Sequence, residues 1–325
     1  MIDITRGILI ISMIIGHFNI DPLLRKIIFS CHMISFVFLS GYCYKKPKNL
    51  LKTILHMCRT MLLPYLLCFL IEILVNLKQF NFEYFFSVFK CYIWGYSFTS
   101  KFHSNTPSVG PVYFILLLFC TRMIFILIDY FCTTTRMKVF FVVCISLVGV
   151  HLGKMGYWLP WSFDVACYAL IFYALGVVGK KYDVLSYVQN NDILYFVLSP
   201  VWAYMIYAGS MEIAIRNYGQ YGLVIIGSIC GFLIINKLSC YISEHLILSK
   251  AILRLAGQFS MFILIVHKLF SFDIISLLDK IGLMEGNLWN MIATVGVQIF
   301  AGILLGFFYM MLNVSARLRR TGLAD

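Results

Sequence analysis

Three ionisable side chains interrupt the apolar sequence at the start of the chain. Arg6 and His17 lie in the first apolar run, I-D-I-T-R-G-I-L-I-I-S-M-I-I-G-H, and His32 lies at the start of C-H-M-I-S-F-V-F-L-S-G-Y. Ionisable groups in segments apolar enough to enter a membrane are costly, so they mark a candidate functional site. An imidazole, with an ordinary pKa of about 6.5, exchanges protons near neutral pH. These residues are therefore candidates for acid–base chemistry.

The spacing of these residues places them along two helices. Arg6 and His17 are eleven residues apart, which corresponds to about 16 Å along an α-helix. A break at Asp21–Pro22 predicts a helical hairpin whose turn centres near Leu24, so we expect His17 and His32 at similar depth. Burial would keep His17 neutral and able to act as a base. The alternative is that His17 is a polar contact between helices.

A strongly basic segment follows the second apolar run, K-K-P-K-N-L-L-K-T-I-L-H-M-C-R-T-M-L-L-P-Y. Its residues Lys45, Lys46 and Arg59 are candidates for binding the phosphates of a phosphorylated donor. Arg offers a planar fork for bidentate hydrogen bonds, and Lys offers a compact positive charge. The alternative is that the segment carries the positive charge common in cytoplasmic loops, where it also contacts anionic lipids.

Further polar residues stand in or next to other apolar runs. Arg122 and Glu72 are both expected inside membrane spans, where they could pair with each other, or Arg122 could face a polar cavity. The segment S-M-E-I-A-I-R-N-Y-G is expected on the opposite side of the membrane from the basic segment. Its residues Glu212, Arg216 and Asn217 could hydrogen-bond a hydroxylated ligand, or they could simply be solvated.

The cysteines and histidines show no pattern typical of a metal site. The eleven cysteines are spread along apolar segments without a C-x-x-C pair, and the chain has no H-E-x-x-H motif. We therefore expect neither a metal centre nor a disulfide framework, and most cysteines should be small core residues.

The composition predicts the kind of fold that positions these residues. Of the 325 residues, 61% are hydrophobic and 12% are charged, and the mean hydropathy is +0.89. A soluble domain has about 45–50% apolar and about 25% charged residues, so we expect an all-α polytopic integral membrane protein. Apolar stretches long enough to cross a membrane predict about ten transmembrane helices, at 4–20, 27–44, 61–77, 109–131, 138–153, 163–179, 192–209, 219–236, 258–277 and 288–312.

The basic residues predict how these helices are oriented. Sixteen of the 26 Lys and Arg residues fall on one side, which includes the terminal segments, eight fall on the other, and two lie within spans. This bias places both termini in the cytoplasm. It also explains the net charge of +12 without nucleic acid as a partner. We expect no cleavable signal peptide, one domain over 1–325, an outer loop at 78–108, and an interfacial or re-entrant segment at 80–100.

The ordered motifs resemble those of the acyltransferase-3 family of membrane O-acyltransferases. R-G-I-L-I-I-S-M-I-I-G-H matches the family's Arg-x10-His motif, and C-H-M-I-S-F-V-F-L-S-G-Y is similar to its second-helix motif. The later pieces L-L-P-Y, G-P-V-Y-F, R-N-Y-G and L-A-G-Q-F-S-M-F-I-L-I-V-H resemble the fucose 4-O-acetylase-like branch. The chain departs from the usual pattern with Ile34 where proline follows the methionine, and with Gln258 before the serine.

This resemblance implies a membrane enzyme that transfers an acyl group, usually acetyl, from acyl-CoA to a carbohydrate hydroxyl. The partners would be a glycan, lipid-linked sugar or polysaccharide, and membrane lipids, in a bacterial inner membrane. His17, Arg6 and His32 would be catalytic, and Arg59, Lys45 and Lys46 would bind acetyl-CoA. The residues expected to bind the acceptor substrate are Arg122, His267, Arg216 and Asn217.

Two other functional classes remain compatible with the sequence. Buried His, Arg and Glu also serve as proton relays in transporters, so a transporter or flippase for a small polar solute is the main alternative. Against it, the chain lacks repeated halves with interrupted helices. A sensory or scaffold protein with a degenerate transferase fold is the third. Binding or turnover of acyl-CoA would distinguish a transferase from both.

Overall fold

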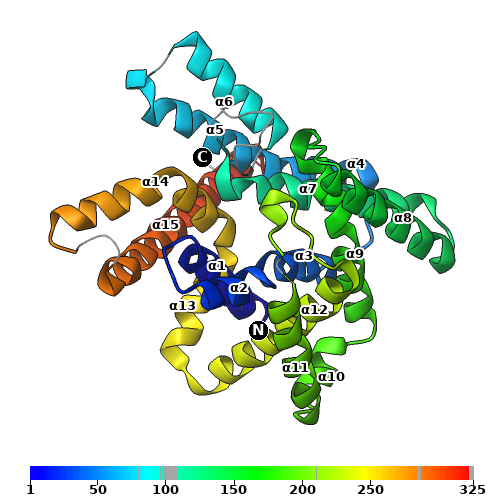
Figure 1. Cartoon of the computed structure of the whole chain (residues 1–325). Helices are drawn as coiled ribbons and strands as arrows, with labels where there is room; N and C mark the ends of the chain where they lie inside the picture. The colour runs from blue at the N-terminus through cyan, green and yellow to red at the C-terminus, as the bar shows by residue number, and fades with distance from the viewer. Residues whose placement is uncertain (80, 96, 98–107, 210, 284–286, 322–325) are drawn as a thin grey trace. The chain divides into compact units, whose positions relative to one another are not determined.

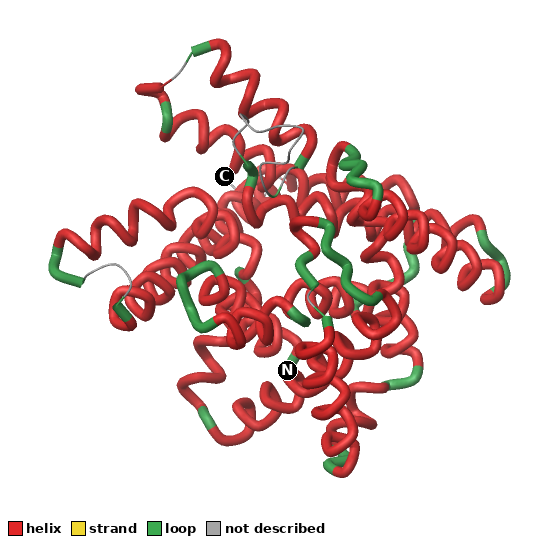
Figure 2. The backbone as a smooth tube through the Cα atoms, in the orientation of Figure 1, coloured by secondary structure: helices red, strands yellow, loops and turns green. Residues whose placement is uncertain are grey.

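The computed structural model describes residues 1–79, 81–95, 97, 108–209, 211–283 and 287–321, with side chains except at 79 and 312–321. These residues form helices joined by short loops (Figure 2). The described part of the chain contains no strand, only an isolated antiparallel bridge between Glu212 and Asn217. The predicted all-α fold is therefore confirmed.

The chain divides into two compact units. The first consists of Met1–Ile20 and Ser239–Asp325. It contains α1 (Ile2–Gly16), the end of α12 (Tyr221–His245), α13 (Ile247–Gln258), α14 (Ser260–Lys280) and α15 (Leu288–Thr321) (Figure 1). The second unit is Asp21–Leu238. It contains α2 (Pro22–Phe29), α3 (His32–Tyr42), α4 (Leu50–Met57), η1 (Cys58–Leu62), α5 (Leu63–Val75), α6 (Phe82–Trp94), α7 (Tyr113–Phe131), α8 (Thr135–Lys154), α9 (Phe163–Lys181), α10 (Val184–Gln189), α11 (Ile193–Ala208) and most of α12.

Eight helical stretches of the described residues are long and apolar enough to cross a membrane. They are Pro22–Tyr42, Leu50–Val75, Gly110–Phe131, Thr135–Lys154, Pro160–Lys181, Tyr221–His245, Ser260–Lys280 and Leu288–Met311. Two of the predicted spans are shorter helices in the structure, because α1 has 15 residues and α11 has 16. The segment at 80–100 contains α6, whose 13 residues are also too few to be counted as a span.

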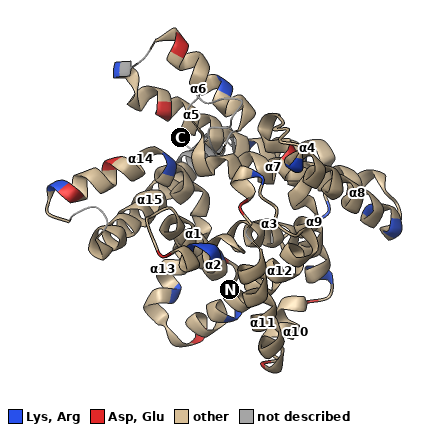
Figure 3. Cartoon of the chain, viewed as in Figure 1, with Lys and Arg blue, Asp and Glu red and all other residues tan. Residues whose placement is uncertain are grey.

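The exposed side chains of these helices are mostly apolar. Phe131, Phe140, Phe272 and Phe300 are each more than 60% exposed, which water would penalise but lipid would not. Lys and Arg, in contrast, gather near helix ends, as α8 illustrates with Arg136 in its first turn and Lys154 as its last residue (Figure 3). This distribution is typical of helices that cross a membrane.

In the first unit, α1 and α13 approach each other closely at two glycines. A Cβ atom on Gly7 would lie 2.0 Å from the carbonyl oxygen of Leu253, and one on Gly257 would lie 1.7 Å from that of Asp3. Both distances are shorter than any tolerated contact, so only glycine allows the two backbones to meet here. A buried hydrogen bond of 2.8 Å between Thr5 and Ser239 also ties α1 to the end of α12.

In the second unit, α9 lies at the centre and packs against α3, α7 and α8 (Figure 1). Its side chains Tyr168, Phe172 and Tyr173 are fully buried. These rings fill the space between the surrounding helices, so α9 holds the ends of α3, α7 and α8 in fixed positions.

The predicted second span is broken into α2 and α3 at Ser30–Cys31. Two neighbouring helices hold this break open. Trp202 of α11 donates a hydrogen bond of 2.9 Å to the Ser30 hydroxyl, and Ser228 of α12 donates one of 2.7 Å to the Ser30 carbonyl. These bonds satisfy polar groups that the interrupted helix leaves exposed in an apolar environment.

Candidate functional site

His17 lies at the end of α1, immediately after its last residue, Gly16. Its Nδ1 atom is 2.7 Å from the carbonyl oxygen of Met13. A carbonyl oxygen only accepts hydrogen bonds, so Nδ1 carries the hydrogen in this arrangement and Nε2 of the neutral ring carries the lone pair. The backbone of α1 therefore selects the tautomer in which Nε2 can act as a base.

The expectation that His17 is buried is wrong, because its side chain is exposed. The reason is that α1 ends one residue earlier, so His17 lies at the end of the helix and not within it. Exposure gives a reactant access to the ring. A base that takes a proton from a bound hydroxyl needs such access.

His267, in α14, is brought next to His17 within the first unit. The two ring centroids are 5.0 Å apart, and the ring planes meet at 65°. His267 is only 6% exposed, and its Nδ1 atom lies 2.9 Å from Oε1 of Gln298 in α15. The motifs included both histidines, but their positions are 250 residues apart in the chain, so nothing in the sequence indicated their contact.

Arg6 lies on the same helix as His17, as predicted. Its NH1 atom is 3.3 Å from the carboxylate of Asp3, and both side chains are about one-third exposed. A pair this exposed contributes little to stability. Asp3 therefore orients the guanidinium without isolating it from an incoming anion.

His32 begins α3 in the second unit, directly after the break at Ser30–Cys31. It is 3% exposed, and its Nδ1 atom is 2.9 Å from the carbonyl oxygen of Ile28. The same carbonyl also accepts a backbone hydrogen bond of 3.5 Å from Cys31, so the His32 side chain adds a second contact to the last turn before the break. Because His17 belongs to the other unit, the matched depth of the two histidines stays a prediction.

The predicted anion-binding residues are exposed in the second unit. Lys45 and Lys46 lie in the loop after α3, and Arg59 lies in η1. This five-residue segment is a π-helix between α4 and α5, and it packs against α7. Short π-helical segments are rare, and those that occur are often at functional sites. This is a structural reason to retain Arg59 as a candidate.

Arg122, in α7, stands near the loop that carries the two lysines. It lies within electrostatic reach of the hydroxyls of Tyr44 and Tyr173. Its Nε atom is buried, and no described residue hydrogen-bonds it. The predicted pairing with Glu72 is replaced by another contact, since the Tyr92 hydroxyl donates a 2.6 Å hydrogen bond to the Glu72 carboxylate.

A second contact organises the end of α7 next to this loop. The Tyr44 hydroxyl donates a hydrogen bond of 2.8 Å to Asp129, and Lys138 of α8 forms an ion pair with the same carboxylate. Asp129 therefore connects the loop after α3 to α7 and α8. This connection fixes the backbone next to Lys45 and Lys46.

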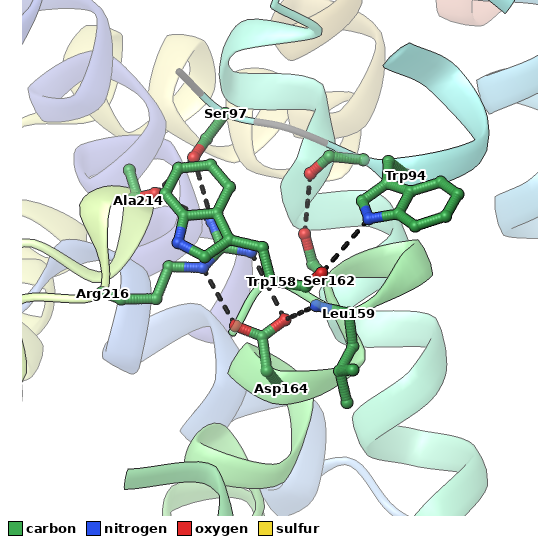
Figure 4. Close-up of polar contacts among 9 residues, drawn as sticks. Trp94, Ser97, Trp158, Leu159, Ser162, Asp164, Ala214 and Arg216 are labelled. Carbon is green, nitrogen blue, oxygen red and sulfur yellow. Dashed lines mark hydrogen bonds and ion pairs between the residues drawn. The ribbon is translucent and has the colours of Figure 1, made fainter. Parts of the chain in front are cut away.

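Arg216 is buried, which was not expected of a ligand-binding residue in an outer loop. Its guanidinium hydrogen-bonds the Asp164 carboxylate at 3.0 and 3.4 Å, and it stacks 3.8 Å from the centroid of the Trp158 ring (Figure 4). The side chains of Arg216 and Asp164 are 2% and 0% exposed. A further contact joins Arg216 to Ser97. Three loops predicted on one side of the membrane thus meet around this guanidinium.

Neighbouring groups extend this cluster, which the sequence did not reveal. Asn217 is exposed and closes the bridge to Glu212. The buried hydroxyls of Tyr113 and Tyr218 have no hydrogen-bond partner among the described residues. Burial, followed by the negative charge of Asp164, raises the pKa of Tyr218 well above its ordinary value, so its phenol stays protonated. The sequence feature that could have indicated this cluster is Asp164, a carboxylate in the first turn of the apolar helix α9.

Among the described residues, no group of three or more His, Cys, Asp or Glu side chains is arranged to hold a metal ion. Two arrangements of described polar side chains, each within a single unit, contain predicted site residues. One is the histidine pair with Gln298, and the other is the Arg216 cluster with its buried tyrosines.

Comparison with known families defines the class of protein. The acyltransferase-3 family model, an acyltransferase domain, matches residues 1–312 and so runs through both compact units. The chain therefore belongs to this family, and it is a membrane acyltransferase that transfers groups other than aminoacyl groups. No curated protein matches the chain, and no solved structure matches it.

Proposed function

We propose that this acyltransferase moves an acetyl group from acetyl-CoA to a hydroxyl of a cell-envelope or secreted carbohydrate. The observation that supports it most is at His17, where the Met13 carbonyl holds Nδ1–H and makes Nε2 the basic nitrogen. An exposed, oriented imidazole suits deprotonation of a hydroxyl. Membership of an acyltransferase family favours this function over transport of a polar solute.

In the direct reaction, His17 takes the proton of the acceptor hydroxyl on Nε2 while the hydroxyl oxygen attacks the thioester carbonyl. The new C–O bond forms, the C–S bond breaks, and the departing thiolate takes the proton back from the imidazolium. The position after α1 places this transient positive charge at the negative end of the helix dipole, which stabilises it. A positioned base of this kind contributes about 10²–10⁴ in rate.

The two-step alternative uses the same nitrogen as a nucleophile. Nε2 of His17 would attack the thioester and form an acyl-histidine, which the acceptor hydroxyl then cleaves. In either route Arg6 would stabilise the negative charge on the thioester oxygen or bind donor phosphates, and its separation of about 16 Å from His17 along α1 favours the phosphates. His32 would orient substrate near the break between α2 and α3.

The donor site is proposed at the basic residues of the second unit. Lys45 and Lys46 in the loop after α3, and Arg59 in η1, are exposed cations. Phosphates and the nucleotide diphosphate of CoA suit such groups. We place this site, with both termini, on the cytoplasmic face of a bacterial inner membrane, because most Lys and Arg residues fall on that side.

The residues proposed to bind the acceptor fall in both units: His267 lies next to His17 in the first unit, and Arg122 and Asn217, the latter expected on the outer face, lie in the second. Arg216 would act there by holding its loop in place, because its hydrogen bonds to Asp164 are buried. The resemblance to the fucose 4-O-acetylase-like branch makes a sugar hydroxyl the favoured acceptor.

The test of this function has two arms. Purified protein should release free thiol from acetyl-CoA, and mass spectrometry of envelope glycans should show an acetyl-sized mass difference between cells with and without the gene. A protein that binds acetyl-CoA but changes no glycan would move the acceptor to another hydroxyl class. A protein that neither binds nor consumes acetyl-CoA would contradict the proposed donor.

A further inference from the structure

Gln298 occupies an unusual place for a primary amide. It lies within the apolar helix α15 and is 0% exposed. Burying an amide costs free energy unless its polar atoms are hydrogen-bonded. Both ends of this amide are used, because Oε1 lies 2.9 Å from Nδ1 of His267 and Nε2 donates a 3.2 Å hydrogen bond to the Ser271 hydroxyl.

The amide belongs to a polar stripe on one side of α15. Asn290, Thr294 and Gln298 are spaced four residues apart, and all three are at most 1% exposed. Thr294 donates a 3.1 Å hydrogen bond to Asn290, which in turn donates one of 2.6 Å to the Leu283 carbonyl. Only Gln298 among these three directs its hydrogen bond to a histidine.

This contact determines the chemical form of His267. With Oε1 as acceptor, Nδ1 of His267 carries the hydrogen, so Nε2 of the neutral ring carries the lone pair. The Ser271 contact keeps the amide oxygen turned towards the histidine, because Nε2 of Gln298 is engaged on the other side. The ring of His267 is thereby held 5.0 Å from that of His17.

We propose that Gln298 is a positioning residue of the acyl-transfer site, which holds the ring and tautomer of His267 so that its Nε2 accepts a hydrogen bond from a second hydroxyl of the carbohydrate, next to the hydroxyl that His17 deprotonates. Its catalytic consequence rests on the proposed function. A ring fixed in this way presents the hydroxyl to the base. Loss of such orientation costs about 10²-fold in rate even when the misplacement is small.

The first test compares Gln298→Met with Gln298→Glu. Methionine has a similar shape but no acceptor, whereas glutamate keeps an oxygen that accepts from Nδ1–H, as a carboxylate does for histidine in hydrolase triads. We expect the methionine variant to lose about 10²-fold in kcat, with the KM for acetyl-CoA within about twofold, and the glutamate variant to retain more activity. The readout is thiol release from acetyl-CoA with an envelope glycan fraction as acceptor.

If Gln298 served only to fill space in the core, the methionine variant would be more active than the glutamate variant. An apolar methionine would then be tolerated and a buried carboxylate would be harmful, so methionine performing as well as glutamate overturns the proposal. Thr294→Val is the matched control, because it removes a buried hydrogen bond one turn away that does not involve His267. It should keep near-normal kcat.

The second test does not depend on turnover. In protein labelled with ¹⁵N-histidine and placed in lipid nanodiscs, the His267 signal is identified by its loss in His267→Gln. We expect protonated Nδ1 and unprotonated Nε2 in the wild type and in Thr294→Val, and a changed tautomer balance in Gln298→Met. An unchanged signal overturns the proposal, whereas a wild-type protein inactive towards acetyl-CoA contradicts only the proposed function.

Discussion

The guanidinium of Arg216 and the carboxylate of Asp164 form two hydrogen bonds, at 3.0 and 3.4 Å, although 52 residues separate them in the chain. Neither side chain is more than 2% exposed. Together with Trp158 they join two loops into one block. Both charges are buried away from water, so each is stabilised by the other. Removing one partner would leave the other charge buried and uncompensated, which is strongly destabilising.

Asp164→Asn is expected to destabilise the second unit by about 3–5 kcal/mol, because it leaves the buried Arg216 charge without its counter-ion. The measurement is thermal unfolding of the purified protein in detergent. Asp192→Asn is the control, since Asp192 pairs with Lys237 but is 81% exposed, and such pairs are worth at most about 1 kcal/mol. Equal effects of the two substitutions would argue against a structural role for the buried pair.

His17→Gln is expected to lower acyl transfer by about 10²–10⁴-fold while acetyl-CoA still binds. An amide can hydrogen-bond but is a poor base, so the substitution separates catalysis from helix packing. The measurement is acetyl transfer at matched membrane expression. His56→Gln serves as the control because His56 is exposed on α4. Near-normal turnover of the His17 variant would remove it as the base.

Arg6→Lys is expected to fail in transfer even though it keeps the positive charge. An ammonium cannot reproduce the planar, bidentate contact of a guanidinium. Measuring kcat and the KM for acetyl-CoA separately shows whether Arg6 acts on the reacting carbonyl or on donor binding. A lysine variant with unchanged kinetics would leave Arg6 with no role beyond its ion pair with Asp3.

Arg59→Ala is expected to weaken acetyl-CoA binding by about 10-fold or more, because hydrogen bonds to charged groups are worth about 1.5–3 kcal/mol. Lys48→Ala should have a smaller effect, since a lysine offers no fork for phosphate. Titration of the purified variants with CoA measures both. If the Arg59 variant binds CoA with unchanged affinity, the basic segment serves only as the positive charge of a cytoplasmic loop.

Reporter fusions test the predicted topology. A fusion after Asp325 and one in the 78–108 loop should report opposite sides of the membrane, with the C-terminus in the cytoplasm, because Lys and Arg are biased to that side. Lys101 of this loop lies outside the described residues. If both fusions report the same side, the prediction of about ten spans is wrong.

Hydropathy predicted the helical membrane fold because long apolar stretches leave few other ways to satisfy the backbone in lipid. It could not predict the break at Ser30–Cys31, since no proline or glycine marks those positions. That break depends on Trp202 and Ser228, which are distant in the sequence.

The motifs also predicted His17 and His267 separately but gave no sign that their rings lie 5.0 Å apart. Gln298 was missed as well. Its signal was the four-residue spacing of Asn290, Thr294 and Gln298 in an otherwise apolar helix, which matches one face of an α-helix. Such a stripe shows that a helix carries a polar side, but only the structure shows which residue it meets.

The glycine contacts between α1 and α13 restrict how this sequence can diverge. Gly7 and Gly257 carry no functional group, yet each meets the opposite backbone where even a methyl group would collide. A side chain at either position would push α1 away from α13 as a rigid helix. Arg6 and His17, which lie on and at the end of α1, would move with it. Substitutions at these glycines would therefore be lost under selection for activity, although neither glycine is proposed to touch a substrate. Related sequences can therefore vary the apolar side chains on the surface of α1, but they must keep Gly7 and Gly257, where α1 meets α13.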